Sequence, residues 1–516
     1  MRCALRRCCV HTGVAVTGVG LIAVALATSP TPAIQARAVQ LVSGDVNADS
    51  LLGDGTALVM GGSGVPLPPA TYVDAAETLY LEPRGFTGSP QALDTPEGFY
   101  PTTGVNSLTA DASEAQGAQI LDDAIKGQIA GGHVDAANPV VVFGYSQSSA
   151  LSSITMQQLE NQGIPSDEVH FVLVGDSAAP NGGLLERFDL PGSDLSVPSF
   201  GITFGDPTPD DLFPTDVYSL EYDGFADFPQ YPIDPLSDLN AFAGMIYEHV
   251  TYLDLSPEQI QNALPLETTG DALTNYYMIP VDDLPLLDPL RLIPVVGNPF
   301  ADLLQPDMQV LVNLGYGSIG DGWSQGPANV PTPFELFPTD LNWSDVLTAL
   351  INGATQGLQA AIGDLENPDN YQIPSLLDNP TLSTLVDSAY TSGLIDTLQP
   401  TTLELTQALL GGSFPVSDVT LLSPLNDIIN DLTSTVAADD AALLPIADTI
   451  NALTTTLPAF DASLFTDQLA AGDLLGAIGD PIAADFAVVP FAISLGVGPI
   501  VDAVEGTVLN FANLIP

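Results

Sequence analysis

The chain has 516 residues, of which 63 are acidic and only eight are basic, so its formal net charge at pH 7 is −55. This charge excludes nucleic acid as a partner on electrostatic grounds and makes anionic lipid headgroups poor partners. Hydrophobic residues make up 46% of the chain, which is ample for a core that needs no disulfides.

Residues 1–38 have the pattern of a secretory signal peptide. Arginines precede an apolar stretch at 14–27, which is short for a bilayer span, and small residues at 25–27 and 36–38 offer cleavage sites. An uncleaved N-terminal anchor is the alternative. The mature chain is expected to lack thiol chemistry, because every cysteine lies in this leader: Cys3, Cys8 and Cys9.

Short strand-like runs alternate with helical stretches over residues 51–320. This alternation predicts an α/β fold with a mostly parallel central sheet. Strands are expected at 56–60, 140–143, 169–174 and 216–222, and helices at 112–129 and 151–162. Residues 241–252 are expected to form a helix or a helix that leads into a loop.

The character of the sequence changes in the region 321–516. No lysine or arginine follows Arg291, and proline interrupts stretches of Leu, Ala, Thr and Asp. Apolar residues at helical spacing predict helices at 343–362 and 437–457. We expect a mostly helical C-terminal region that carries no chemical motif.

The segment Gly144-Tyr145-Ser146-Gln147-Ser148 lies between an apolar run and a helical stretch. Strand, tight turn with a central serine, and helix are the features of a nucleophile elbow, which predicts Ser146 as the nucleophile. Small residues two before and two after the serine let the strand and helix approach closely. The usual pattern has glycine at the second of these positions, and Ser148 departs from it.

A serine nucleophile needs a base, and only three histidines follow the leader. His170 lies within an apolar strand, and His133 lies in a predicted surface loop. His249 follows the strands and completes the order serine, acid, histidine that α/β-hydrolases use. His249 is therefore the predicted base.

The acid is expected just after a late strand. Asp223 follows the strand-like run 217–222 and precedes a glycine, where a turn would present its carboxylate to an imidazole. Asp227 is the runner-up. A lone aspartate carries little information in so acidic a chain, and the other candidates between serine and histidine are Asp176, Asp206 and Asp216.

Acyl transfer builds negative charge on an oxygen, which calls for preorganised N–H donors. The amide of Gln147, directly after the nucleophile, is one expected donor. The glycine-rich segment after the first strand is expected to supply another, from Ser63 or Gly62. A simple glycine-rich turn is the alternative interpretation of that segment.

Four short motifs follow one another along the chain: G-G-S-G-V-P at 61–66, G-Y-S-Q-S at 144–148, Y-D-G-F-A-D-F-P at 222–229 and L-R-L-I-P at 290–294. In this order they resemble the PE-PPE domain, a mycobacterial serine α/β-hydrolase domain related to cutinases. The resemblance covers residues 51–316. It implies an α/β-hydrolase fold and an exported esterase or lipase, with the family's serine, acid and base falling on Ser146, Asp223 and His249.

The expected function is a secreted serine esterase or lipase that cleaves acyl esters or lipids through an acyl-serine intermediate. The first alternative is an acyltransferase that uses the same residues to acylate an envelope glycolipid. The second alternative is a non-catalytic envelope interaction protein on a hydrolase scaffold. Neither a metal nor another cofactor is expected, and the sequence makes no prediction of the oligomeric state.

Overall fold

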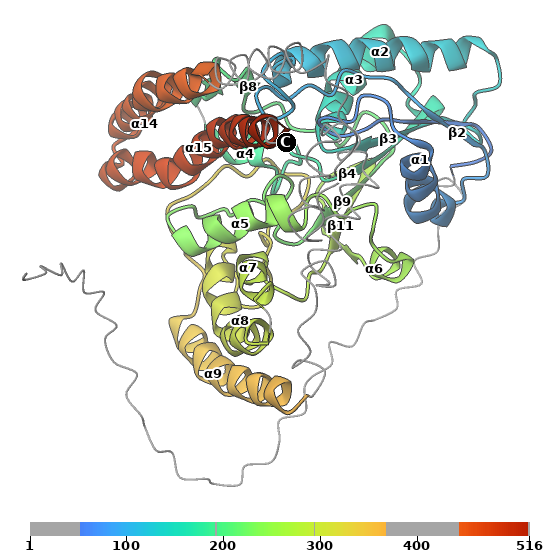
Figure 1. Cartoon of the computed structure of the whole chain (residues 1–516). Helices are drawn as coiled ribbons and strands as arrows, with labels where there is room; N and C mark the ends of the chain where they lie inside the picture. Colours follow the sequence, from blue (N-terminus) through green and yellow to red (C-terminus); the bar gives the residue numbers. More distant parts are fainter. Residues whose placement is uncertain (1–51, 191–192, 294, 368–442, 514–516) are drawn as a thin grey trace, which may run out of the picture. The chain divides into compact units, whose positions relative to one another are not determined.

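The computed structural model describes residues 52–190, 193–293, 295–367 and 443–513 (Figure 1). The predicted leader at 1–38 lies outside these residues, as does the first part of the helix predicted at 437–457. The first strand of the fold begins shortly after the described part starts, at Thr56.

Seven strands form one sheet in the order β10-β11-β9-β4-β3-β1-β2. All neighbours pair in parallel except β10 with β11. The mostly parallel α/β sheet predicted from the sequence is therefore confirmed. The strands are β1 (Thr56–Val59), β2 (Ser89–Ala92), β3 (Val140–Tyr145), β4 (Val169–Val174), β9 (Thr215–Leu220), β10 (Leu264–Pro265) and β11 (Thr274–Ile279).

The three central strands are buried at every residue. Helices cover both faces of such a sheet, so its strands appear in sequence as continuous apolar runs. Val141 and Phe143 of β3 pack on the face covered by α1 (Ala70–Ala76). Val140 and Val142 point the other way, toward α2 (Ala110–Ala130) and α3 (Gln147–Gln162), which lie side by side in Figure 1.

The structure corrects two predicted boundaries near the site. The strand expected to reach residue 222 ends at Leu220, and the helix expected at 241–252 is α5 (Pro235–Tyr247). Pro235 suits the first helical position, and the carboxylate of Asp234 accepts a hydrogen bond from the Leu236 N–H. The helix consequently starts earlier and ends before His249, which lies in the turn that follows.

The sequence pattern predicts no strand at β2, β10 or β11. β2 is an edge strand with mostly exposed residues and a proline, so it lacks the apolar signal of the central strands. Two short hairpins also lie between β4 and β9: β5 (Asp189–Leu190) with β6 (Ser193–Asp194), and β7 (Ser196–Val197) with β8 (Ile202–Thr203).

The described part of the C-terminal region is largely helical, as predicted. Within this region α14 (Leu457–Ala471) packs against α15 (Leu474–Asn513), and α9 (Trp343–Glu366) packs against α8 (Gly297–Asn313), which precedes the region. The segment between α8 and α9 runs without a long helix and buries apolar side chains: Trp323, Ala328 and Phe334.

Candidate active site

Ser146 occupies a sharp turn between β3 and α3. Its backbone has φ 59° and ψ −119°. Residues other than glycine rarely adopt this conformation outside strained functional turns. Gly144 is required next to it, because a Cβ there would lie 2.8 Å from the carbonyl oxygen of Ser148. Strand, strained serine and helix together form a nucleophile elbow.

Ser148, the departure from the usual motif, has a structural role in this turn. Its hydroxyl accepts a hydrogen bond from the Tyr145 N–H at 2.7 Å and donates to the Tyr145 carbonyl at 3.1 Å. Glycine could make neither bond. The serine therefore ties the end of β3 to the first turn of α3 and fixes the geometry around Ser146.

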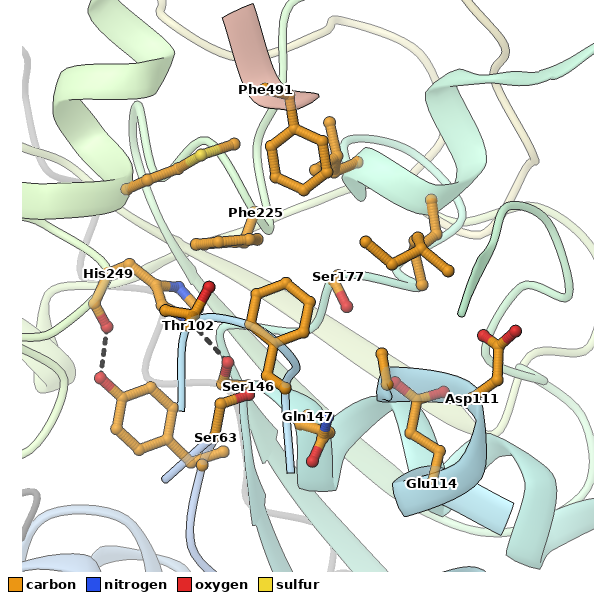
Figure 2. Close-up of a pocket in the computed structure, with 18 of the residues that line it drawn as sticks. Ser63, Thr102, Asp111, Glu114, Ser146, Gln147, Ser177, Phe225, His249 and Phe491 are labelled. Carbon is orange, nitrogen blue, oxygen red and sulfur yellow. Dashed lines mark hydrogen bonds between the residues drawn. The ribbon is translucent and has the colours of Figure 1, made fainter. Parts of the chain in front are cut away.

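His249 connects Ser146 to a carboxylate. Its Nε2 lies 2.8 Å from Ser146 Oγ (Figure 2), and its Nδ1 lies 2.9 and 2.8 Å from the two oxygens of Asp223. Asp223 is completely buried and His249 is 7% exposed. The structure thus brings together the three residues that the sequence nominates as nucleophile, base and acid.

The turn after β9 holds Asp223 in place. Its N–H donates to the Leu220 carbonyl, and its carboxylate accepts from the Phe225 N–H at 3.0 Å. The Tyr252 hydroxyl donates to Oδ2 of Asp223 at 2.8 Å and itself accepts from the Leu220 N–H. Sequence reasoning missed Tyr252, because nothing in its neighbourhood marks a side chain that reaches β9.

The main chain of His249 is anchored as well. Its N–H donates to the Gly244 carbonyl in the last turn of α5, and its carbonyl accepts from the Tyr145 hydroxyl. The Phe225 ring packs against the imidazole with centroids 4.6 Å apart. Both the position and the tilt of the imidazole are therefore set by neighbouring residues.

The runner-up acid has other partners. The carboxylate of Asp227 accepts from the Tyr222 N–H at 3.0 Å, and burial raises its pKa well above the usual value although the Arg187 guanidinium opposes this. Asp176 is buried, and its carboxylate accepts hydrogen bonds from the Thr208 hydroxyl and the Ala178 N–H. Burial raises the pKa of Asp176 to about 6.

The remaining candidates also lie away from Ser146. His170 Nε2 is 3.0 Å from a carboxylate oxygen of Asp216, whose other oxygen pairs with Arg84. His133 is exposed in a loop, and Asp206 has a positive φ of 60°.

Two free N–H groups face the space beside the serine. Within the described part of the chain, the amides of Gln147 and Ser63 donate to no protein acceptor, and both residues line the cavity. Gly62 comes close to the nucleophile, since a Cβ there would lie 3.3 Å from Ser146 Cβ. The Gln147 side chain, bonded to Ser113 and to the Gly98 carbonyl, holds the start of α3. A helix N-terminus is a favourable place for a developing oxyanion.

Ser146 opens into a cavity of about 230 Å³. One part of the wall is apolar, and Phe491 of α15 contributes to it (Figure 2). Asp111 and Glu114 lie at another side, where burial and neighbouring carboxylates raise the pKa of Glu114 to about 8. Among the described residues, no group of three or more His, Cys, Asp or Glu side chains is arranged to hold a metal. The apolar lining residues are Val65, Phe99, Leu184, Leu185, Ile202, Phe225, Met245, Val250 and Phe491.

A parallel sheet with a serine elbow and an ordered histidine and acid defines the α/β-hydrolase class. The PE-PPE domain model matches residues 87–317. The uncharacterised PPE family protein PPE28 of Mycobacterium tuberculosis (strain ATCC 25618 / H37Rv) is 39% identical over 93% of this chain and 70% of its own length. This chain therefore belongs to the PE-PPE domain family, which confirms the resemblance shown by the four motifs.

Two further relatives from the same strain carry functional names. Esterase PE16 is 41% identical over 58% of this chain and 55% of its own length. Diacyltrehalose acyltransferase Chp2 is 26% identical over 52% of this chain and 76% of its own length. The chain spans 53 to 63% of the second to fourth relatives. A cutinase-like protein from Cryptococcus sp. aligns with 34% of this chain and 79% of its own at 16% identity and a TM-score of 0.23, too low to support an argument.

Proposed function

We propose that this protein is a serine carboxylic-ester hydrolase that cleaves acyl esters through an acyl-serine intermediate. The observation that carries the proposal is the continuous hydrogen-bonded chain from Ser146 through His249 to Asp223, at an elbow that opens into a largely apolar cavity. The name of the relative Esterase PE16 supports the same chemistry.

In the first half-reaction, Ser146 Oγ attacks the ester carbonyl carbon while His249 Nε2 takes the hydroxyl proton. Asp223, at Nδ1, stabilises the resulting imidazolium. The carbonyl oxygen gains negative charge and accepts from the Gln147 and Ser63 amides. When the tetrahedral intermediate collapses, the carbon–alkoxy bond breaks, and His249 returns the proton to the departing alcohol, which leaves an acyl-serine.

In the second half-reaction, water attacks the acyl-serine and His249 Nε2 accepts its proton. The bond to Ser146 Oγ then breaks, and the proton passes back to Oγ as the carboxylic acid leaves. The cavity of about 230 Å³ is smaller than the range typical of drug-sized ligands. We therefore expect short acyl chains to fit best.

Replacing the nucleophile tests the proposal. Ser146→Ala is expected to lower kcat for p-nitrophenyl butyrate on the order of 10⁴-fold, because among the described residues only the Ser146 hydroxyl is hydrogen-bonded to His249 Nε2. The matched control is Ser177→Ala, a serine of the same cavity without a hydrogen bond to His249. Circular dichroism checks that both variants fold. Unchanged turnover in Ser146→Ala would refute the assignment.

A non-catalytic role on the same scaffold is tested by labelling. A fluorophosphonate should attach covalently to Ser146 in the wild type, with the modified peptide identified by mass spectrometry. Absence of labelling in folded protein would favour the interaction-protein alternative.

Export to the cell envelope is also part of the proposal and rests on the leader sequence. Finding the labelled protein only in the cytosolic fraction would contradict it.

Acyl transfer is the second candidate, and two relatives named as acyltransferases favour it: Diacyltrehalose acyltransferase Chp2 and SL1278 acyltransferase Chp1. An acceptor hydroxyl would replace water in the second half-reaction, and its proton would go to His249. Product analysis with a p-nitrophenyl ester and a glycolipid acceptor separates the two functions. Transfer predicts an acylated acceptor in place of free fatty acid.

A further inference from the structure

The segment 474–496 of α15 exposes a row of large apolar residues, while its opposite face is buried against the protein. The outward residues recur every three, four or seven positions, which places them on one face of the helix. They are 43 to 64% exposed: Leu475, Ile478, Ile482, Phe486 and Ile493, called here the apolar stripe. The buried face is rich in alanine but also holds three larger side chains: Ala477, Ala483, Ala484, Ala487, Val488, Phe491, Ala492 and Leu495.

The exposed face is the unusual one, because a surface helix normally exposes polar side chains there and this segment exposes large apolar ones. Small residues at helix contacts with large apolar residues facing outward are typical of helices in lipid. The segment 474–496 also has a mean hydropathy of 1.5, in the range of membrane helices. Its opposite face packs into the protein, so a position on a lipid surface suits it better than a span.

Only the thickness of one helix separates the apolar stripe from the active-site cavity. Phe491 lies on the buried face of α15 and lines the cavity that contains Ser146. An α-helix with its side chains is about 10–12 Å across. A lipid surface in contact with the stripe would therefore lie within about that distance of the cavity wall.

The charge of the region selects the kind of lipid. No lysine or arginine follows Arg291 in the sequence, whereas Asp473, Asp480 and Asp485 belong to the hairpin of α14 and α15. Anionic headgroups would be repelled, and basic clusters that recognise them are lacking in this part of the sequence. Uncharged and zwitterionic lipids carry no such penalty.

We propose that the apolar stripe docks on the surface of an uncharged or zwitterionic lipid phase that holds the ester substrate. Docking brings the cavity next to the lipid, so an acyl ester reaches Ser146 without crossing bulk water. This docking goes beyond the hydrolysis proposed above and does not depend on it, since a protein without activity would bind the same surface.

Vesicle flotation with the full chain tests the docking. The wild type should float with phosphatidylcholine vesicles and less with vesicles that contain phosphatidylglycerol. The variant Leu475→Ser/Ile478→Ser/Ile482→Ser should bind at least 10-fold more weakly and keep its rate on soluble p-nitrophenyl butyrate. The comparison variant Leu347→Ser/Ile351→Ser/Leu358→Ser changes a similarly exposed apolar face of α9, which does not line the cavity, and should float like wild type. An equal loss of flotation in this variant would overturn the assignment of docking to the stripe.

The remaining outcomes overturn the proposal. Wild type that stays at the bottom of the gradient, or a stripe variant that floats as well as wild type, would remove lipid as the partner. A dimer that the stripe variant dissociates would assign the stripe to a second copy of the chain. Ser146→Ala should float like wild type, which separates a failure of docking from a failure of the hydrolase assignment.

Discussion

The central sheet and α9 place their large apolar side chains in opposite directions. In the sheet, large side chains such as Phe143 face inward and every residue of β3 is buried. In α9 the buried face includes Gly353, Gly357 and Ala361, while large side chains face outward. The direction in which large apolar side chains point therefore separates a rigid scaffold from a surface available for contacts.

The same substitution in the two regions should give the largest contrast. Phe143→Ala removes a completely buried ring and is expected to lower the free energy of unfolding by about 3–5 kcal/mol. Phe486→Ala in α15 removes a ring that is 43% exposed and should change it by no more than about 0.5 kcal/mol. Urea denaturation measures both. Equal losses of unfolding free energy in the two variants would contradict the difference in burial between the two regions.

A buried carboxylate in the scaffold should make its stability depend on pH. Burial raises the pKa of Glu97 to about 8, against 4.5 when unfolded, so the folded state binds more protons between these values and loses stability as pH rises through this window. Glu97→Gln should therefore stabilise the protein at pH 8 relative to wild type, on the order of 2–4 kcal/mol.

The difference in the free energy of unfolding between Glu97→Gln and wild type should shrink toward pH 5, where residue 97 is uncharged in both folded proteins. Asp467→Asn, at an exposed position of α14, is the control for the loss of one carboxylate. Thermal denaturation across the pH range provides the measurement. A pH-independent gain would point to packing and not to ionisation.

Tyr252 tests how closely the scaffold positions the reacting groups. Tyr252→Phe removes one donor to Asp223 and should lower kcat about 10-fold with KM unchanged, since a hydrogen bond to a charged group contributes about 1.5–3 kcal/mol. Tyr316→Phe also removes a buried hydroxyl, which donates to the Asp227 carbonyl, but should leave kcat intact. A matching loss in both variants would indicate general destabilisation.

The smallest expected effect links the two regions. Phe491→Ala enlarges the cavity from the side of α15 and should raise the rate on longer p-nitrophenyl esters relative to the butyrate several-fold. Phe486→Ala, on the opposite face of the same helix, should leave the chain-length profile unchanged. An identical profile in all three proteins would show that α15 has no part in substrate selection.

Local patterns were sufficient to predict the central strands and the elbow, because β3 is a continuous apolar run that ends in a tight turn. The scarcity of histidine then pointed to His249. Tyr252 and Phe491 could not be found in this way, since their roles depend on contacts between segments far apart in the sequence. β2 escaped notice because an exposed edge strand carries no apolar periodicity.

The strained turn at Ser146 has a cost outside catalysis. A non-glycine residue at φ 59° and ψ −119° destabilises the fold by about 1–3 kcal/mol. Glycine would adopt this conformation freely, so Ser146→Gly should melt at a higher temperature than wild type while losing its nucleophile. The position that makes the protein reactive is thus one where the chain gives up thermal stability, which exemplifies a trade-off between stability and activity at a single residue.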